Sequence, residues 1–232
     1  MRRAAFDKPG FVSLAADVSG GVLAAQKGRF VVVVDVIDMS TTLEAVREAG
    51  AVGCWGAAPT NTKMPDSIRQ QTNPYLIGKT AARLARASGA QVVVISEPRA
   101  AEDEKRRETA AGVLAGIASE KAPLAGLLPN LGAETAKLTD WRNKIAIAVT
   151  AAGGTVFDAV WQAGGGLTTA TVARTLKMKG HEPALKGIKR IMTLSAGRPL
   201  TLVAASSNAL EDILAVRYLA QLIRENQGYL DW

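Results

Sequence analysis

Two carboxylates and three hydroxyls follow a run of four valines, in a pattern that could bind a phosphate group or a metal ion. Asp35 comes directly after Val31–Val34, Asp38 follows it closely, and the hydroxyls are those of Ser40–Thr42. Carboxylate oxygens are ligands that Mg²⁺ prefers, so Asp35 and Asp38 are candidate metal ligands and catalytic residues. Hydroxyls at the start of a helix suit phosphate, because the free N–H groups and partial positive charge of a helix N-terminus attract anions.

The valine run predicts the element that positions these groups. β-Branched residues in an unbroken run indicate a strand over 31–37 that is buried on both faces. A helix is predicted over Thr41–Ala49, with Glu44 at the spacing of a capping partner. Ligands of open α/β sheets bind where such strands end. Two interpretations stay open, because Ser40 and Thr41 could contact a ligand or could only cap the helix.

Two later segments repeat the order of strand, small residues, polar residue and helix. The first spans Ile147–Ala159 and contains Gly153 and Gly154, and the second spans Leu202–Ile213 and contains Asn208. Such turns bring backbone N–H groups close to anions, so these three residues are candidate substrate-binding residues. All strand-to-helix turns of a parallel sheet emerge at one edge, which predicts that both turns face the same cleft as Asp35. A turn of small residues required only for packing is the alternative.

Strands and helices are expected to alternate along the whole chain. The predicted strands are Phe11–Leu14, Val31–Ile37, Ala51–Trp55, Gln91–Ser96, Lys144–Val149 and Leu200–Ala204. The predicted helices are Thr41–Ala49, Pro74–Ala87, Ala101–Lys121, Thr155–Gln162, Thr168–Lys179, Pro183–Leu194 and Ala209–Glu225. This alternation predicts an α/β protein with a three-layer α/β/α fold and a largely parallel or mixed central sheet. Residues 1–232 are expected to form a single α/β domain or two α/β halves that meet near 123–142.

The positive charge of the chain is concentrated in one segment. The net charge is +7, and the basic residues between Arg174 and Arg198 account for most of it. Such a strip could hold a small anionic metabolite, could bind nucleic acid, or could be solvated. No aromatic residue interleaves with the cations, which disfavours single-stranded nucleic acid. Arg190 is the candidate substrate-binding cation, because a guanidinium can grip an oxyanion with two hydrogen bonds.

Composition excludes several classes of site. The chain has one cysteine, Cys54, and one histidine, His181, so a Cys/His zinc site cannot be built. No apolar run is long enough for a transmembrane helix, and we expect no membrane partner. The first residues lack the apolar core of a signal peptide, so we expect a cytoplasmic protein. A homo-oligomer is compatible with the composition.

The stretch Val31–Ala51 resembles the 2-phosphosulfolactate phosphatase family of the coenzyme M pathway. The resemblance is carried by Asp35, Ser40–Thr42 and the alanine- and valine-containing helix that ends at Gly50. Weaker similarities are Asn73-Pro74 with Gly78-Lys79-Thr80, and Lys189–Met192. The specific match covers about twenty residues.

The resemblance implies an α/β/α fold and a Mg²⁺-dependent phosphatase for a small, strongly anionic phosphoester. It carries the family aspartate over to Asp35 and the hydroxyl pair to Ser40 and Thr41. Asp38 stands where the family has an arginine, and the family's Gly-Gly-Glu-Arg and Thr-Thr-Asn-Gly-Thr segments are not found. Loss of the arginine removes a bidentate phosphate clamp.

Three functions follow from these observations. The first is a Mg²⁺-dependent, phosphatase-like hydrolase of a small anionic phosphoester such as a phosphosulfolactate-type metabolite. The second is a non-catalytic ligand-binding or oligomeric scaffold protein of the same fold. The third and weakest is a nucleic-acid-binding protein that uses the basic strip.

Overall fold

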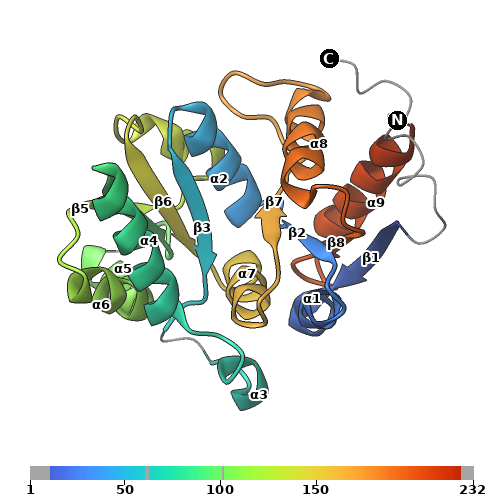
Figure 1. The fold of residues 1–232 in the computed structure, drawn as a ribbon. Coiled ribbons are helices and arrows are strands. Elements are labelled where there is room, and N and C mark those ends of the chain that lie inside the picture. Colours follow the sequence, from blue (N-terminus) through green and yellow to red (C-terminus); the bar gives the residue numbers. More distant parts are fainter. Residues whose placement is uncertain (1–10, 61–62, 101, 226–232) are drawn as a thin grey trace.

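The strands form two parallel sheets. The computed structural model describes residues 11–60, 63–100 and 102–225. The first sheet has the order β1-β8-β2-β7 and the second the order β3-β6-β4-β5, and each has four strands (Figure 1). The strands are β1 (Val12–Ala16), β2 (Phe30–Val34), β3 (Gly53–Ala57), β4 (Gln91–Ser96), β5 (Leu124–Pro129), β6 (Lys144–Val149), β7 (Leu167–Thr169) and β8 (Leu200–Ala204).

The α/β class is confirmed, and helices cover both sheets in the layered arrangement of an α/β/α fold. The strands divide between two parallel four-stranded sheets that share a core. The helices are α1 (Asp17–Gln26), α2 (Met39–Glu48), α3 (Asp66–Arg69), α4 (Pro74–Ser88), α5 (Asp103–Thr109), α6 (Ala111–Ser119), the 3-10 helix η2 (Gly132–Lys137), α7 (Gly153–Gln162), α8 (Glu182–Ser195) and α9 (Leu210–Glu225).

Alternation of side chains along each strand builds three hydrophobic clusters. Val31 and Val33 of β2 belong to a cluster that also contains residues of β4, β6 and α7, so the two sheets share a core. Val32 and Val34 pack instead with residues of α8 and α9. In Figure 1, α7 lies between the two sheets. The valine run is therefore apolar throughout because both faces of β2 are covered.

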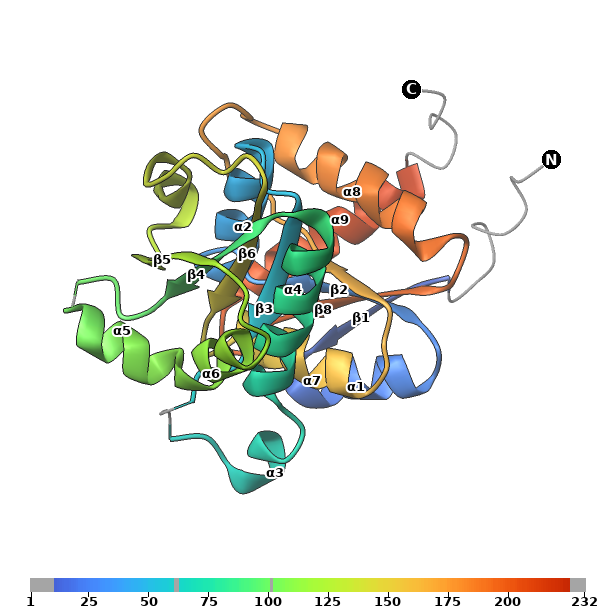
Figure 2. The same cartoon turned by 60° about the vertical axis from the view of Figure 1, so that its left-hand side comes forward.

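Helices α4 and α6 cover the outer face of the second sheet, as Figure 2 shows. Two glycines allow these helices to approach each other closely. A Cβ added to Gly78 would overlap the Val113 backbone, and one added to Gly116 would overlap the Tyr75 backbone. The close packing of α4 on α6 therefore depends on residues without a side chain.

Two predicted elements differ in the structure. The helix expected over Thr168–Lys179 is wrong, because Leu167–Thr169 forms β7 and pairs in parallel with β2. The single helix expected over Ala101–Lys121 is divided into α5 and α6, which meet at Ala110. Residues 123–142, where two halves were expected to meet, contain β5 and η2. The chain passes from one sheet to the other before β3 and again before β7.

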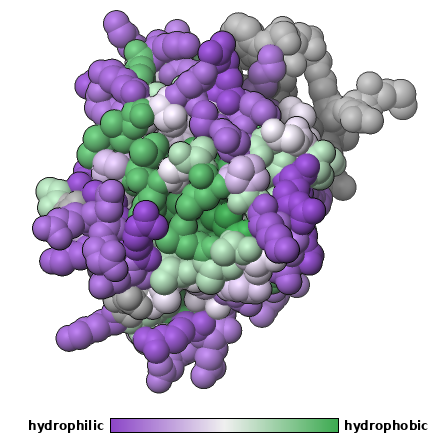
Figure 3. Space-filling view, turned by 90° about the vertical axis from the view of Figure 1, so that its left-hand side faces the viewer, coloured by the Kyte–Doolittle hydropathy of each residue, from purple (hydrophilic) through white to green (hydrophobic). Residues whose placement is uncertain are grey.

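The face that carries the edge strand β5 has an apolar area, which Figure 3 shows. Leu124 of β5 and Leu131, which closely follows the strand, are large exposed apolar residues. An uncovered edge strand is a common site of association between chains, and the homo-oligomer stays a prediction.

Within the described part of the chain, no helix has both the length and the apolar character needed to span a membrane.

Candidate functional site at the carboxyl ends of the strands

Asp35 lies at the carboxyl end of β2 and connects this strand to α7. Its side chain is buried, Oδ1 accepts a hydrogen bond from the Asp38 N–H at 3.0 Å, and Oδ2 accepts one from the Gly153 N–H at 2.8 Å. Burial raises the pKa of Asp35 and the nearby Asp38 carboxylate raises it further, whereas the backbone hydrogen bonds lower it. A Cβ at position 153 would overlap the Asp35 carboxylate, so glycine is required there.

Asp38 belongs to a second group of charges at the same edge. Arg99, which follows β4, forms an ion pair with Asp38, and both side chains are partly exposed. Glu97 is hydrogen-bonded to Asp38, and its pKa is raised to about 7 by burial first and then by Asp38, against the opposing effect of Arg99. Two carboxyl groups in contact disfavour double ionisation, so this pair retains a proton near neutral pH.

Asp212 of α9 adds a further carboxyl group near the end of β2. Its Oδ1 accepts a hydrogen bond from the Val36 N–H at 2.8 Å. Burial raises its pKa to about 6, and the Asp35 carboxylate adds to this effect. The edge therefore holds several carboxyl groups that resist ionisation together.

The three predicted hydroxyls are buried and bound to protein groups. Ser40 Oγ is hydrogen-bonded to the hydroxyl of Thr169 and accepts from the Asp35 N–H at 2.9 Å. The Thr41 hydroxyl lies 2.8 Å from that of Thr171, and the Thr42 hydroxyl donates to Asn130 Oδ1 at 2.5 Å. These hydrogen bonds connect the start of α2 to β7, to the residues after β7 and to Asn130, which follows β5. None of the three acts as a side-chain N-cap of α2.

Arg190 is largely buried, and its guanidinium contacts protein groups. Its guanidinium forms a two-point ion pair with the Glu44 carboxylate, with an Nη1–Oε1 distance of 3.0 Å and an Nη2–Oε2 distance of 2.5 Å. Nη2 also donates to the Thr169 carbonyl at 2.8 Å. The pair joins α2 to α8. In the same basic strip, Arg198 lies over the Phe30 ring, whereas Lys177, Lys186 and Lys189 are exposed.

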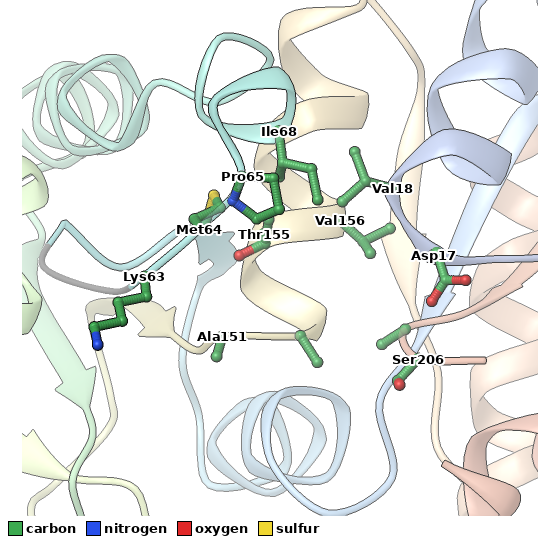
Figure 4. Close-up of a pocket in the computed structure, with 12 residues that line it drawn as sticks. Asp17, Val18, Lys63, Met64, Pro65, Ile68, Ala151, Thr155, Val156 and Ser206 are labelled. Atoms are coloured by element: carbon green, nitrogen blue, oxygen red, sulfur yellow. The ribbon is translucent and has the colours of Figure 1, made fainter. Parts of the chain in front are cut away.

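The turn before α7 and the turn after β8 line one pocket. This pocket has a volume of about 350 Å³, and Ala151, Ala152 and Thr155 of the first turn and Ala205 and Ser206 of the second contribute to its lining. The two turns thus face one space, as their equivalent places in parallel sheets predict. Figure 4 shows the arrangement.

The predicted residues of these turns lie beside the pocket and not in its lining. Asp35, Gly153, Gly154 and Asn208 are not among the lining residues. The Gly154 N–H donates to Thr150 Oγ1 at 2.8 Å, and the exposed Asn208 donates its N–H to Ser206 Oγ at 3.2 Å. Their backbone N–H groups are therefore used within the turns.

The residues at this edge do not fit the metal centre that the resemblance implies. Among residues 11–60, 63–100 and 102–225, no three His, Cys, Asp or Glu side chains come together in a group that could hold a metal ion. Both oxygens of Asp35 accept backbone hydrogen bonds, and Asp38 pairs with Arg99. The binding of Mg²⁺ by Asp35 and Asp38 stays a prediction.

The chain was compared with protein-family models, curated proteins and solved structures. None of them matches it. The resemblance to the 2-phosphosulfolactate phosphatase family therefore stays a prediction from about twenty residues. The chemistry of the site must be argued from its geometry.

Sequence reasoning missed three residues of this edge: Glu97, Arg99 and Thr155. Glu97 and Arg99 directly follow the apolar strand β4, as Asp35 follows β2. Their place just after an apolar strand is the same signal that marks Asp35. Thr155 lies in the small-residue turn expected to face the cleft, but its lack of a hydrogen-bond partner appears only in three dimensions.

Proposed function

We propose that this chain is a hydrolase of a small anionic ester, with a phosphoester as the first substrate class. The observation that carries the proposal is the Asp38–Glu97 carboxyl pair beside Arg99. A carboxyl group whose pKa is about 7 suits general acid–base catalysis at neutral pH. The partly exposed guanidinium of Arg99 has the planar geometry that binds oxyanions.

Each group has one role in the proposed reaction. Arg99 holds the anionic group of the ester. Asp38 raises the pKa of Glu97, so that Glu97 carries a proton near neutral pH. Water attacks the phosphorus atom and its proton passes to a phosphate oxygen, while the bond from phosphorus to the leaving oxygen breaks. Glu97 gives its proton to that oxygen, and the products are inorganic phosphate and an alcohol.

Hydrolysis of p-nitrophenyl phosphate tests the proposal. We expect Glu97→Gln to lower kcat/KM by about 100-fold or more, the usual contribution of a general acid. The exposed Glu104 of α5 supplies the control, and Glu104→Gln should leave kcat/KM unchanged. In the parent protein, kcat/KM should fall as the pH rises above about 7, because Glu97 must be protonated. Absence of turnover at every pH would contradict the proposal.

The same assay separates the proposed reaction from metal-dependent hydrolysis. Since the described residues form no group that could hold a metal ion, we expect EDTA to leave turnover unchanged. Turnover that EDTA abolishes and Mg²⁺ restores would favour the chemistry implied by the family resemblance.

A ligand-binding protein without catalysis is the second candidate. It is favoured by the pocket of about 350 Å³ between the turns before α7 and after β8, whose lining does not include Asp38 or Glu97. A compound that raises the melting temperature without being turned over would favour this candidate over the hydrolase.

A further inference from the structure

Three strands that are distant in the sequence end at the pocket shown in Figure 4. The carboxyl ends of β1, β6 and β8 contribute Asp17, Ala151 and Ala205 to the lining. The two alanines leave space between the turns. The volume of about 350 Å³ falls within the range of about 300–1,000 Å³ that is typical of small-molecule sites.

Thr155 lines this pocket with a hydroxyl group that has no protein partner. The residue is 3 % exposed, and its Oγ1 is buried without a hydrogen bond. In Figure 4 the hydroxyl points from α7 toward the side of the pocket formed by Lys63 and Met64. A buried hydroxyl without a partner costs free energy, which a bound acceptor or donor recovers.

The pocket carries opposite charges at opposite sides. Lys63 and Asp17 lie at the two sides in Figure 4, with Thr155 between them and nearer to Lys63. Asp17 has a φ of 61°, and its Oδ1 accepts a hydrogen bond from the Ser207 N–H at 2.8 Å, so its carboxylate is held in place. An anionic group is attracted to the Lys63 side and a cationic group to the Asp17 side, so a molecule that carries both charges gains at both sides.

Apolar side chains occupy the space between these charges. Val18, Met64, Pro65, Ile68 and Val156 line the pocket. They suit a short aliphatic chain, because burial of methylene groups against apolar walls is favourable. The lining therefore combines a cation, a free hydroxyl, an apolar wall and a carboxylate.

We propose that this pocket binds a small zwitterion with a short aliphatic chain between its charges. Its carboxylate accepts a hydrogen bond from Thr155 Oγ1, the exposed Lys63 side chain turns toward it from the rim of the pocket, and its ammonium group faces Asp17. This site is distinct from the Asp38–Glu97 pair, and the proposal does not depend on hydrolase activity.

Calorimetric titration with 4-aminobutanoate, 5-aminopentanoate and 6-aminohexanoate tests the proposal, because these probes differ only in chain length. At least one should bind the parent protein. Pentanoate and pentylamine, which each carry a single charge, should bind at least about tenfold more weakly than the best zwitterion, since each lacks one charge-assisted interaction.

Variants of the lining identify the contacts. Asp17→Asn keeps an acceptor for the Ser207 N–H and removes the negative charge. Lys63→Gln removes the positive charge. Each variant should bind the best zwitterion about tenfold more weakly than the parent protein does. Thr155→Val should weaken binding without lowering the melting temperature of the ligand-free protein, because it removes an unpaired hydroxyl. Thr42→Val is the control, since its hydroxyl bonds to Asn130 and its loss should lower the melting temperature.

The outcomes separate this site from the proposed reaction. Glu97→Gln should bind the zwitterions as the parent does, whether or not the parent hydrolyses esters. The proposal is overturned if no zwitterion of the series binds, if pentanoate binds as tightly as the best zwitterion, or if Asp17→Asn and Lys63→Gln both retain the parent affinity.

Discussion

At the scale of single residues, the environment of a carboxyl group determines the chemistry it can perform. Asp35 and Glu97 both follow apolar strands, yet they differ in their partners. Both oxygens of Asp35 are held by backbone N–H groups, whereas Glu97 contacts a second carboxyl group, that of Asp38. Glu97 is thus able to exchange a proton near neutral pH, while Asp35 mainly holds β2 against α7.

The pKa of Glu97 should respond in opposite directions to its two neighbours. Asp38→Asn removes a nearby negative charge and should lower the pKa of Glu97 from about 7. Arg99→Met removes a nearby positive charge and should raise it. Titration of the side-chain carboxyl carbon by ¹³C NMR measures both shifts. Equal pKa values in the parent and both variants would show that burial alone determines the value.

At the scale of secondary-structure elements, α2 is held by buried polar contacts on several sides. The Glu44–Arg190 pair connects it to α8, and Thr42 connects it to Asn130 after β5. The Glu44 side chain is 1 % exposed and that of Arg190 is 13 % exposed, so solvent screens the pair little. These contacts position the start of α2, and with it Asp38, at the edge of the sheets.

Breaking the pair from one side should destabilise the protein strongly. Arg190→Met leaves the Glu44 carboxylate buried without its partner, which should lower the free energy of unfolding by about 3–5 kcal/mol. Adding Glu44→Leu removes the uncompensated charge and should restore part of the loss. Urea denaturation of both single variants and the double variant measures the coupling. A double variant that loses the full sum of both single effects would show that the pair is not coupled.

The contact between α4 and α6 gives a second prediction at this scale. Gly116→Ala places a methyl group on the Tyr75 backbone, which cannot move aside as a flexible side chain would. We expect a loss of about 1–3 kcal/mol in the free energy of unfolding, the usual cost of overpacking. Ala115→Ser, at an exposed position of the same helix, should change it little. Similar urea midpoints for the two variants would be inconsistent with close packing at Gly116.

At the scale of the whole molecule, several buried carboxyl groups make folding sensitive to pH. The pKa of Glu97 is raised to about 7, and those of Asp158 and Asp212 are raised to about 6. Burial is the largest cause in each case. The folded protein therefore binds more protons than the unfolded chain between about pH 4 and pH 7.

The melting temperature should fall as the pH rises from about 5 to about 8. The stabilisation from these raised pKa values is complete below the pKa values of the unfolded chain and is lost as the pH passes the folded values. Asp140 is the opposite case, because Arg142 lowers its pKa to about 2. The effect of this exposed group on stability changes only below about pH 4, which lies outside the range tested. Differential scanning calorimetry across the range tests the sign. Maximum stability at pH 8 would contradict it.

Local patterns determined most of the elements without reference to the fold. The valine run predicts β2, and Pro74 followed later by Gly89 predicts the start and end of α4, because strand burial and helix termini depend on neighbouring residues. The same patterns located Asp35 at the end of a strand. The segment 168–179 was misassigned because its β7 residues form a strand only through pairing with β2.

Contacts between distant parts of the chain determined how the candidate residues are used. The Thr41 hydroxyl meets Thr171, 130 residues away, and Arg190 meets Glu44, 146 residues away. The sequence alone placed hydroxyls before a helix and a guanidinium on another, and it left their partners undetermined. Only the tertiary structure assigns these groups to internal contacts and brings Glu97, Arg99 and Thr155 to the open edge, because strand order decides which strand ends become neighbours.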